Sequence, residues 1–423
     1  MQADTEEIDC ASESCSLFAQ NGPSSHLQLS VIVPVRNEAH HLIDTLNALR
    51  LQRDSTGQLL NSDLYEVLML ANNCTDYSYE IAADYQQQHP DFPLRIAQIH
   101  LPPAKANIGT VRRILMDEAY QRLLSVGRMN GIIASTDGDT VVDSHWVYNI
   151  MLEIAKGNDA VGGRILTHSE PSQVRLYHLR DVMYRTLVAK AEALFDPCSH
   201  DPWPRHFQHF GASLAVTCQM YNQVGRLPKR PFLEDEAFYR ALLRMDAKVR
   251  KSPSVKVFTS SRMEGRVAVG FSEQLRYWSA MNQTNQCQMA EPAEAVIIRL
   301  RNRRRLRQCW QMHPQDWVTL QQIAGDLRID PHWLLHELER SRYFGELWEK
   351  IDEKMATGLW ASHWQPVPIT TAIRAIRTYL ANAESIVFET DPIGTYPSAD
   401  PAGDVAAAPR PLSPETVHGP DRP

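Results

Sequence analysis

Two aspartates separated by one glycine, Asp137-Gly138-Asp139, directly follow Gly131–Ser135 and Thr136. Carboxylates with this spacing at the end of a strand can face the same ion, and glycine lets the backbone turn sharply between them. Such oxygen ligands suit Mn²⁺ or Mg²⁺, which complete their coordination with water and substrate phosphate oxygens. A cation held there would neutralise charge on a departing diphosphate. The alternative for this segment is a plain Asp-Gly turn that leads into a helix.

A second acidic group, Glu234-Asp235-Glu236, precedes a helical pattern that extends to Arg244. Acidic residues are common at the start of a helix, because the helix dipole and the free N–H groups favour negative charge. An ionised carboxylate within hydrogen-bond reach of a hydroxyl can instead act as a general base. The residues alone favour the ordinary acidic first turn.

The elements that position these groups alternate along the first part of the chain. Apolar, β-branched runs predict strands, and the segments between them have helical periodicity. Asn37 is expected to cap the first helix, whose apolar face carries Leu42, Leu46 and Leu49. The predicted strands are Leu29–Val35, Tyr65–Leu70, Leu94–Ile99 and Gly131–Ser135, and the next helices are Thr75 or Asp76 to Tyr85 and Thr110–Leu124.

This alternation predicts an α/β fold with a mostly parallel central sheet flanked by helices. Ligands of such sheets bind beyond the carboxyl ends of the strands. Polar residues follow the predicted strands at residues 36–38, 72–76, 105–109 and 137–139. These four segments are therefore expected to form one site.

The later part of the chain has a different organisation. Val161–Thr167, Gly211–Thr217 and Val255–Ser260 continue the ordered pattern, and residues 292–384 are expected to be all-helical. The predicted divisions are a disordered segment 1–26, a catalytic domain 27–280, a helical C-terminal extension 281–386 and a disordered tail 387–423.

One basic run, Leu300–Arg307, lies within the predicted extension. It could contact an anionic membrane surface or an acidic partner. We favour a charged helix that packs Leu300, Leu306 and Trp310 on the catalytic domain, because no large apolar anchors accompany the arginines.

Composition limits the compartment and the partners. The 423 residues have a net charge of −7, which argues against a nucleic-acid partner. No apolar run is long enough for a transmembrane segment, and the acidic N-terminus does not resemble a signal peptide. The seven cysteines contain no CxxC pair. A reduced, cytoplasmic protein is expected.

Six segments in order resemble the family 2 glycosyltransferases. They are LSVIVPV, VPVRNE, LMLANNCTD, AKANIGTVRRILMDEA, ASTDGDT and LEDEAFYRALL, and the resemblance covers about residues 28–270. It implies a GT-A type nucleotide-diphospho-sugar transferase fold and a hexosyltransferase-like activity of enzyme class EC 2.4. A sugar would pass from a UDP- or GDP-type donor to a hydroxyl of an unidentified acceptor, with a divalent cation and with inversion.

The resemblance also implies roles for particular residues. Asp137 and Asp139 would bind the cation, Asp235 would be the catalytic base, and Glu234 would orient the acceptor or a loop. Asn72 stands where the family usually has an aspartate that reads the nucleobase, and an amide can donate as well as accept. The implied donor-binding residues are Pro34, Val35, Arg36, Asn37, Glu38, Asn72, Asp76, Lys105, Arg112, Asp137 and Gly138.

On the acceptor side, the resemblance implies contacts from Gly211 and Ser213. Arg262 and Arg266 would complete a diphosphate clamp, or would lie on the surface. Cys198, His200, His206 and His209 do not have standard zinc-site spacing, so zinc is not favoured there.

Two other functions remain open at this stage. A nucleotidyltransferase also combines an α/β sheet with paired acids, but VPVRNEAHH lacks the glycines typical of its phosphate loop. A nucleotide-sugar-binding protein without catalysis is the second alternative, although both acidic motifs are intact.

Overall fold

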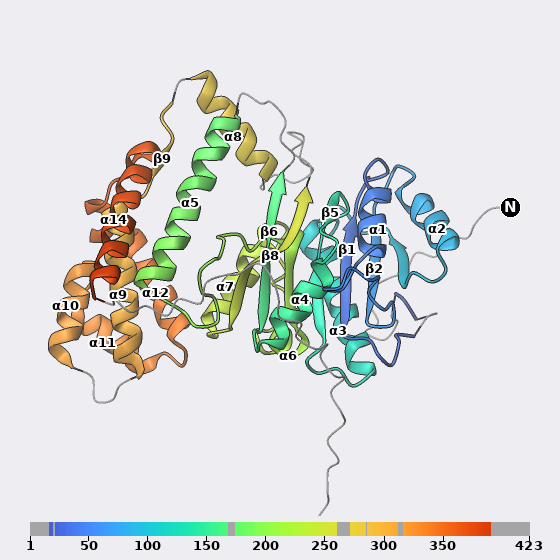
Figure 1. Cartoon of the computed structure of the whole chain (residues 1–423), viewed down its shortest axis with the longest axis horizontal. Coiled ribbons are helices and arrows are strands. Elements are labelled where there is room, and N and C mark those ends of the chain that lie inside the picture. The colour runs from blue at the N-terminus through green and yellow to red at the C-terminus, as the bar shows by residue number, and fades with distance from the viewer. Residues whose placement is uncertain are drawn as a thin grey trace, which may run out of the picture. The chain divides into compact units, whose positions relative to one another are not determined.

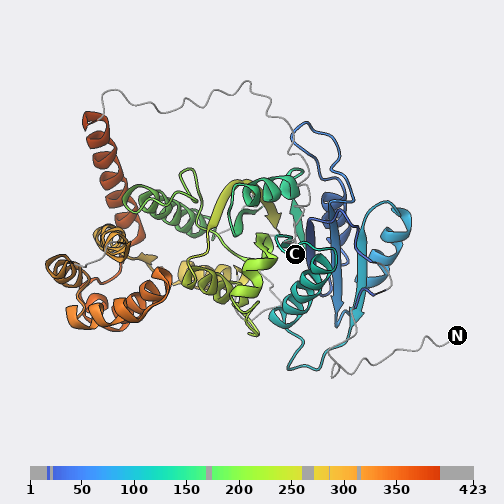
Figure 2. The same cartoon turned by 90° about the horizontal axis from the view of Figure 1, so that it is seen from below.

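Four parallel strands form one half of the central sheet. They are β1 (Leu29–Val35), β2 (Tyr65–Asn72), β3 (Leu94–Ile99) and β4 (Ile132–Ser135), in the order β3-β2-β1-β4. Every residue of β1 and β2 is buried, which explains why these segments are continuously apolar instead of alternating. β1 and β2 run side by side in both views of the chain (Figure 1; Figure 2). The predicted parallel strands are confirmed.

The other half of the sheet is mixed. β7 (Leu214–Thr217) is antiparallel to β4 and to β6 (Ala160–Thr167), and β6 is parallel to β8 (Val249–Thr259). A short strand, β5 (Thr140–Val142), pairs antiparallel with β8. The full order is β3-β2-β1-β4-β7-β6-β8-β5.

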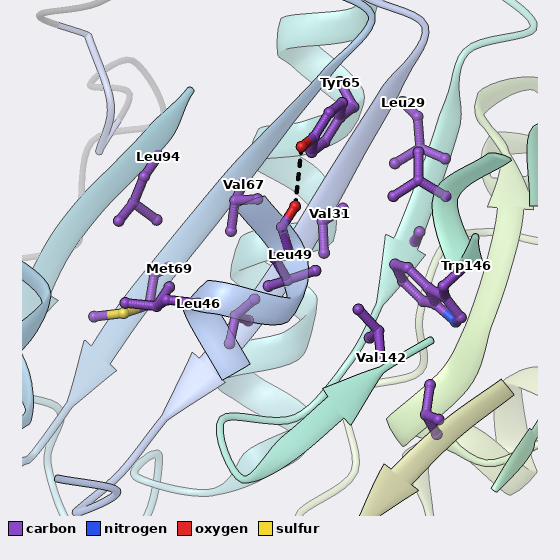
Figure 3. Close-up of a cluster of buried hydrophobic side chains, with 14 of the residues drawn as sticks. Leu29, Val31, Leu46, Leu49, Tyr65, Val67, Met69, Leu94, Val142 and Trp146 are labelled. Carbon is purple, nitrogen blue, oxygen red and sulfur yellow. Dashed lines mark hydrogen bonds between the residues drawn. The ribbon is translucent and has the colours of Figure 1, made fainter. Parts of the chain in front are cut away.

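Helices cover both faces of this sheet. The helices α1 (Leu42–Arg50), α2 (Ser78–Gln88) and α4 (Trp146–Ala155) pack on one face. The other face carries α3 (Ile108–Ser125), α6 (Cys218–Gln223) and α7 (Glu234–Arg244). Figure 3 shows part of the first cluster, where the Tyr65 hydroxyl donates to the Leu49 carbonyl at 2.9 Å. The α/β class predicted from the sequence is confirmed.

The first helix begins later than expected. Leu42, Leu46 and Leu49 are buried as predicted, but the helix is preceded by His41, and Asn37 has a left-handed φ of 55°. Asn37 is therefore not the N-cap, because its side chain bonds Thr75 in the neighbouring loop. α3 does have an asparagine cap, in which Asn107 Oδ1 accepts from the Thr110 N–H.

The structure, a computed structural model, describes residues 17–19, 22–167, 174–259, 271–284, 286–311 and 316–390. Residues 1–16 and 391–423, which include most of the two predicted disordered ends, lie outside these ranges. The chain divides into the units Met1–Thr378 and Tyr379–Pro423. In the second unit, the described residues form the end of one helix.

The remaining elements are mainly helical. A two-residue antiparallel pair, β9 (Met289–Ala290) with β10 (Val367–Pro368), is the exception to the all-helical expectation. The helices are α5 (Arg175–Phe195), α8 (Phe271–Gln283), α9 (Ala293–Gln311), α10 (Trp317–Leu327), α11 (Pro331–Arg340), α12 (Phe344–Thr357), α13 (Leu359–His363) and α14 (Ile369–Thr390). None of the helices described is both long enough and apolar enough to cross a bilayer.

The basic run of α9 contacts α5 through charge. Arg303 pairs with Glu192 and with Asp196, and Arg307 also pairs with Asp196, whose side chain is 0% exposed. Leu306 and Trp310 belong to an apolar cluster of α9–α13. The prediction that these two side chains pack on the catalytic domain is therefore wrong, because arginines make that contact.

Candidate active site

Hydrogen bonds join the loops that follow β1 and β2. Asn37 Nδ2 donates to Thr75 Oγ1 at 3.1 Å, and the Thr75 N–H donates to Asn37 Oδ1 at 2.7 Å. The Ala39 N–H donates to Asp76 Oδ2 at 3.1 Å. Two of the predicted donor-binding residues, Asn37 and Asp76, thus hold the loops together.

The Asp137-Gly138-Asp139 turn packs against the loop after β1. A Cβ atom added to Gly138 would lie 3.0 Å from Val35 Cγ2 and 3.3 Å from the Pro34 carbonyl oxygen. A larger residue at this position would push these neighbours apart by a few tenths of an ångström, so glycine favours the close approach of the turn to the loop. The turn leads into the short strand β5 and then, past Asp143 and Ser144, into the helix α4, whose N-cap residue is His145.

The two aspartates of this turn suit a divalent cation. Asp137 Oδ1 accepts a 2.7 Å hydrogen bond from Arg112 Nη2. Burial raises the pKa of Asp137 to about 6; Arg112 opposes this shift, whereas the nearby Asp139 adds to it. A divalent cation relieves such crowding of negative charge. The described residues contain no cluster of three or more metal-ligating side chains, so water and phosphate oxygens would supply the remaining ligands.

Four buried polar atoms near these segments have no hydrogen-bond partner among the described residues. They are Asn72 Oδ1, Arg112 Nε, Ser135 Oγ and Thr136 Oγ1. Asn72 ends β2, and Ser135 and Thr136 end β4 or follow it. Buried polar groups are normally paired, so these atoms can accept or donate to a ligand. Sequence reasoning missed Ser135 and Thr136, although both are polar residues at the end of an apolar run.

The second acidic group starts α7, as one of the sequence interpretations stated. Glu234 is 3% exposed and accepts a hydrogen bond from Arg112 Nη1. Asp235 Oδ2 accepts from the Gly211 N–H, and its Oδ1 accepts from the Glu236 N–H, both at 2.8 Å. Arg112 therefore connects the two acidic motifs, which are almost one hundred residues apart in the sequence.

Glu236, which had no predicted role, fixes the loop that carries Gly211. Its Oε2 lies 2.6 Å from His209 Nε2, and a hydrogen bond from His209 lowers the pKa of Glu236 to about 2. The His209 ring stacks on Tyr239 with centroids 3.9 Å apart. His206 Nε2 lies near two carbonyl oxygens, those of Gly162 and Ser252. His206 and His209 thus have separate partners, while His200 Nδ1 lies 3.2 Å from Cys198 Sγ.

The two predicted acceptor contacts differ in position. The Cα of Gly211 faces the Arg112 guanidinium, because an added Cβ would lie 2.5 Å from Arg112 Cζ. Ser213 is 1% exposed, and Trp146 Nε1 donates to its hydroxyl at 2.9 Å. Ser213 is held inside the fold by this bond, and its contact with an acceptor stays a prediction.

Residues 30–205 match the model of the family described as Glycosyl transferase family 2. This segment is a family 2 glycosyltransferase domain. The α/β sheet, which continues beyond this segment through β7 and β8 and has helices on both faces, is of the GT-A type. The match includes the Asp137-Gly138-Asp139 turn and ends before Asp235.

Three solved structures that are similar to this chain are the following. TarS 1-349 from S. aureus is 14% identical, with 77% of this chain and 90% of that chain covered and a TM-score of 0.39. The mannosyltransferase PcManGT from Pyrobaculum calidifontis is 16% identical, with 86% of this chain and 87% of that chain covered and a TM-score of 0.40. Glucosyl-3-phosphoglycerate synthase from Mycobacterium tuberculosis is 16% identical, with 62% of this chain and 83% of that chain covered and a TM-score of 0.32. No curated protein matches the chain.

Five further predicted donor-side residues differ in exposure or lie outside the described part of the chain. Arg36 is exposed, and its Nη1 donates to the Ala106 carbonyl at 3.1 Å. Lys105 is exposed in the turn before α3. Glu38 is buried beside Gly138. Arg262 and Arg266 fall outside the described residues.

Proposed function

We propose that this glycosyltransferase moves a sugar from a UDP- or GDP-type nucleotide-sugar to an acceptor hydroxyl, with Mn²⁺ or Mg²⁺ and with inversion. The supporting observation is the contact of the Asp137-Gly138-Asp139 turn with the loop 34–38, beside buried polar atoms that have no partner among the described residues. This contact lies where ligands bind in sheets of this kind, at the carboxyl ends of the parallel strands.

The donor would occupy the ends of β1, β2 and β4. Asn72 Oδ1 is buried and can accept a hydrogen bond from a base or ribose, while its amide nitrogen can donate. Asp137 and Asp139 would hold the cation. Bound there, the cation would bind the donor diphosphate and stabilise the charge that develops on it.

Asp235 is our candidate for the general base. Both of its oxygens accept backbone N–H bonds, which fix its orientation, and each keeps a second lone pair for an acceptor hydroxyl. In the proposed step the acceptor oxygen bonds to the anomeric carbon and its proton passes to Asp235. The bond between the anomeric carbon and the diphosphate oxygen breaks, and its electron pair leaves with the nucleoside diphosphate.

Donor hydrolysis tests the reaction class before the acceptor is identified. The protein is incubated with UDP- and GDP-sugars and Mn²⁺, and the products are separated by ion-exchange chromatography. We expect slow release of nucleoside diphosphate and free sugar. In a parallel incubation with added pyrophosphate, conversion of the sugar nucleotide and pyrophosphate to nucleoside triphosphate and sugar phosphate would indicate a nucleotidyltransferase instead. Donor binding without any product would indicate a binding protein.

A further inference from the structure

Arg112 lies between the two acidic motifs and touches both. The residue is 5% exposed, and its Nη2 donates to Asp137 Oδ1 at 2.7 Å. Its Nη1 donates to Glu234, which is itself 3% exposed. The planar guanidinium is suited to this arrangement, because it presents separate donors in fixed directions. A lysine ammonium would not reproduce both directions.

The bond to Asp137 orients a carboxylate that is a proposed cation ligand. With Oδ1 held by Arg112, Oδ2 remains for the ion, and the Asp137 side chain is one-third exposed. Carboxylates that bind metals are commonly held by a further hydrogen bond, and loss of that bond weakens metal binding about 10- to 100-fold.

The bond to Glu234 orients the first turn of α7. Glu234 is the first residue of that helix and is followed directly by Asp235. Burial raises the pKa of Glu234 and the Arg112 charge opposes this shift. If Arg112 were absent, a buried carboxylate would lose its charged partner, and the turn that carries Asp235 would have to adjust.

Gly211 provides a second link between Arg112 and the proposed base. Its Cα lies against the guanidinium, and its N–H donates to Asp235 at 2.8 Å. Movement of the Arg112 guanidinium therefore affects Asp235 through Glu234 and through Gly211.

We propose that Arg112 is a positioning residue that couples cation binding at Asp137 to the placement of Glu234 and Asp235. This inference rests on the proposed function. The sequence resemblance had suggested that Arg112 contacts the nucleotide, but both of its terminal nitrogens already bond carboxylates. Arg112 thus acts on the reaction through Asp137 and α7.

A substitution that removes the charge of Arg112 distinguishes positioning from a simple effect of charge, because the two explanations predict opposite changes in Mn²⁺ affinity. If Arg112 acted only as a nearby positive charge, Arg112→Gln would make Mn²⁺ bind more tightly, because repulsion would fall. Coupling through orientation predicts weaker Mn²⁺ binding by about 10-fold or more. Arg112→Lys keeps the charge but cannot bridge both carboxylates, so we also expect weaker binding.

The experiment is a double-mutant cycle on Mn²⁺ affinity, measured by electron paramagnetic resonance with Mn²⁺ alone and with UDP or GDP added. The variants are Arg112→Gln, Glu234→Gln and the pair. We expect Glu234→Gln to weaken Mn²⁺ binding by several-fold in the natural protein and to have no further effect beside Arg112→Gln. The matched control is Arg113→Gln, because the neighbouring Arg113 pairs with Asp117 at 2.6 Å and not with either acidic motif. Mn²⁺ affinity should be unchanged in this control.

Each result has a distinct meaning. Tighter Mn²⁺ binding by Arg112→Gln, or additive effects in the cycle, would overturn the coupling and leave the proposed function intact. A natural protein that binds no Mn²⁺, alone or with nucleotide, would overturn both. If Arg112→Gln does not fold, as judged by circular dichroism, Arg112→Lys replaces it in the same cycle.

Discussion

The Gly211 N–H and the Asp235 carboxylate are joined by a hydrogen bond of 2.8 Å. Gly211 belongs to the short helix η1 (Gly211–Ser213), which precedes β7, whereas Asp235 lies in the first turn of α7. The second Asp235 oxygen accepts from the Glu236 N–H. The carboxylate is therefore held from two sides and has a fixed direction, as a general base requires.

Replacing Asp235 by asparagine keeps its shape but removes its basicity. We expect Asp235→Asn to lower transfer or donor hydrolysis by about 10²- to 10⁴-fold, the usual contribution of a general base. Donor affinity, measured by calorimetry with Mn²⁺, should stay the same. Asp44→Asn, at an exposed position in α1, is the control and should retain full activity. Normal turnover by Asp235→Asn would remove Asp235 from the mechanism.

Asp139 should be required for cation-dependent donor binding. Asp139→Ala removes one of the two proposed cation ligands, so the rise in melting temperature caused by Mn²⁺ with a nucleotide should be lost. Asp143→Asn serves as control, because the new side chain can still accept from the His145 N–H as Asp143 does. An unchanged thermal shift in Asp139→Ala would show that the ion binds elsewhere.

The contact between Gly211 and Arg112 predicts that Gly211→Ala is poorly tolerated. The added methyl would lie 2.5 Å from Arg112 Cζ, so the guanidinium or the loop must shift. We expect a loss of stability of about 1–3 kcal/mol and an activity loss of at least about 10-fold, corresponding to a transition-state effect above 1.4 kcal/mol. Gly325→Ala, which has open space and lies within α10, should be neutral or stabilising. Full activity of Gly211→Ala would contradict the close contact.

Asp196 should contribute strongly to stability. Its side chain is 0% exposed and pairs with Arg303 and Arg307 of α9. Asp196→Asn removes the charged partner of Arg307 and one of the two charged partners of Arg303. We therefore expect unfolding in urea to show a loss of about 3 kcal/mol, the lower end for broken buried pairs, because both arginines are partly exposed and Arg303 keeps Glu192. Arg305→Gln should cost under about 1 kcal/mol, since its partner Asp326 is half exposed. Equal losses of unfolding free energy in Asp196→Asn and Arg305→Gln would contradict the role given to the burial of Asp196.

His206 predicts a pH dependence of stability. Burial is the main cause that lowers its pKa to about 3, and the nearby Lys251 lowers it further. Below pH 6.5 the unfolded chain binds a proton that the folded protein does not. The free energy of unfolding should therefore fall with pH from about 6.5 towards 3, by up to about 1.4 kcal/mol per pH unit from this residue.

His206→Gln should make this pH dependence shallower. The measurement is urea unfolding at several pH values between about 4 and 7, an interval that covers most of the range between the folded and unfolded pKa values of His206. His40→Gln, at an exposed position, is the control and should keep the slope of the natural protein. The account of His206 would be wrong if both variants had that slope.

The sequence predicts the parallel half of the sheet well. β1 and β3 have the expected bounds. β1 is buried on both faces and leaves a continuous apolar signal, whereas β3 is mostly half-buried and its apolar residues are interrupted by Arg95 and Gln98. β5 was missed, since its three residues follow the acidic turn and pair only with β8, which is more than one hundred residues later in the chain. Such a pairing leaves no local pattern.

Predictions for the site differ in the same way. Asp137, Gly138 and Asp139 were identified from their spacing and their place after a strand. The partners of Arg112 could not be identified, because Asp137 and Glu234 reach it only after the sheet has formed. The hydroxyl of Ser213 accepts from Trp146 of α4, a partner that the sequence could not reveal for the same reason.

The most direct test of the account is a crystal of the protein soaked with Mn²⁺ and a nucleoside diphosphate. Anomalous scattering should place one Mn²⁺ between the Asp137 and Asp139 carboxylates and the diphosphate, with the nucleoside beside Asn72. If the space beside Asp137 and Asp139 were filled only by protein side chains, with nucleotide absent or bound elsewhere, the proposed cation and donor site would be contradicted.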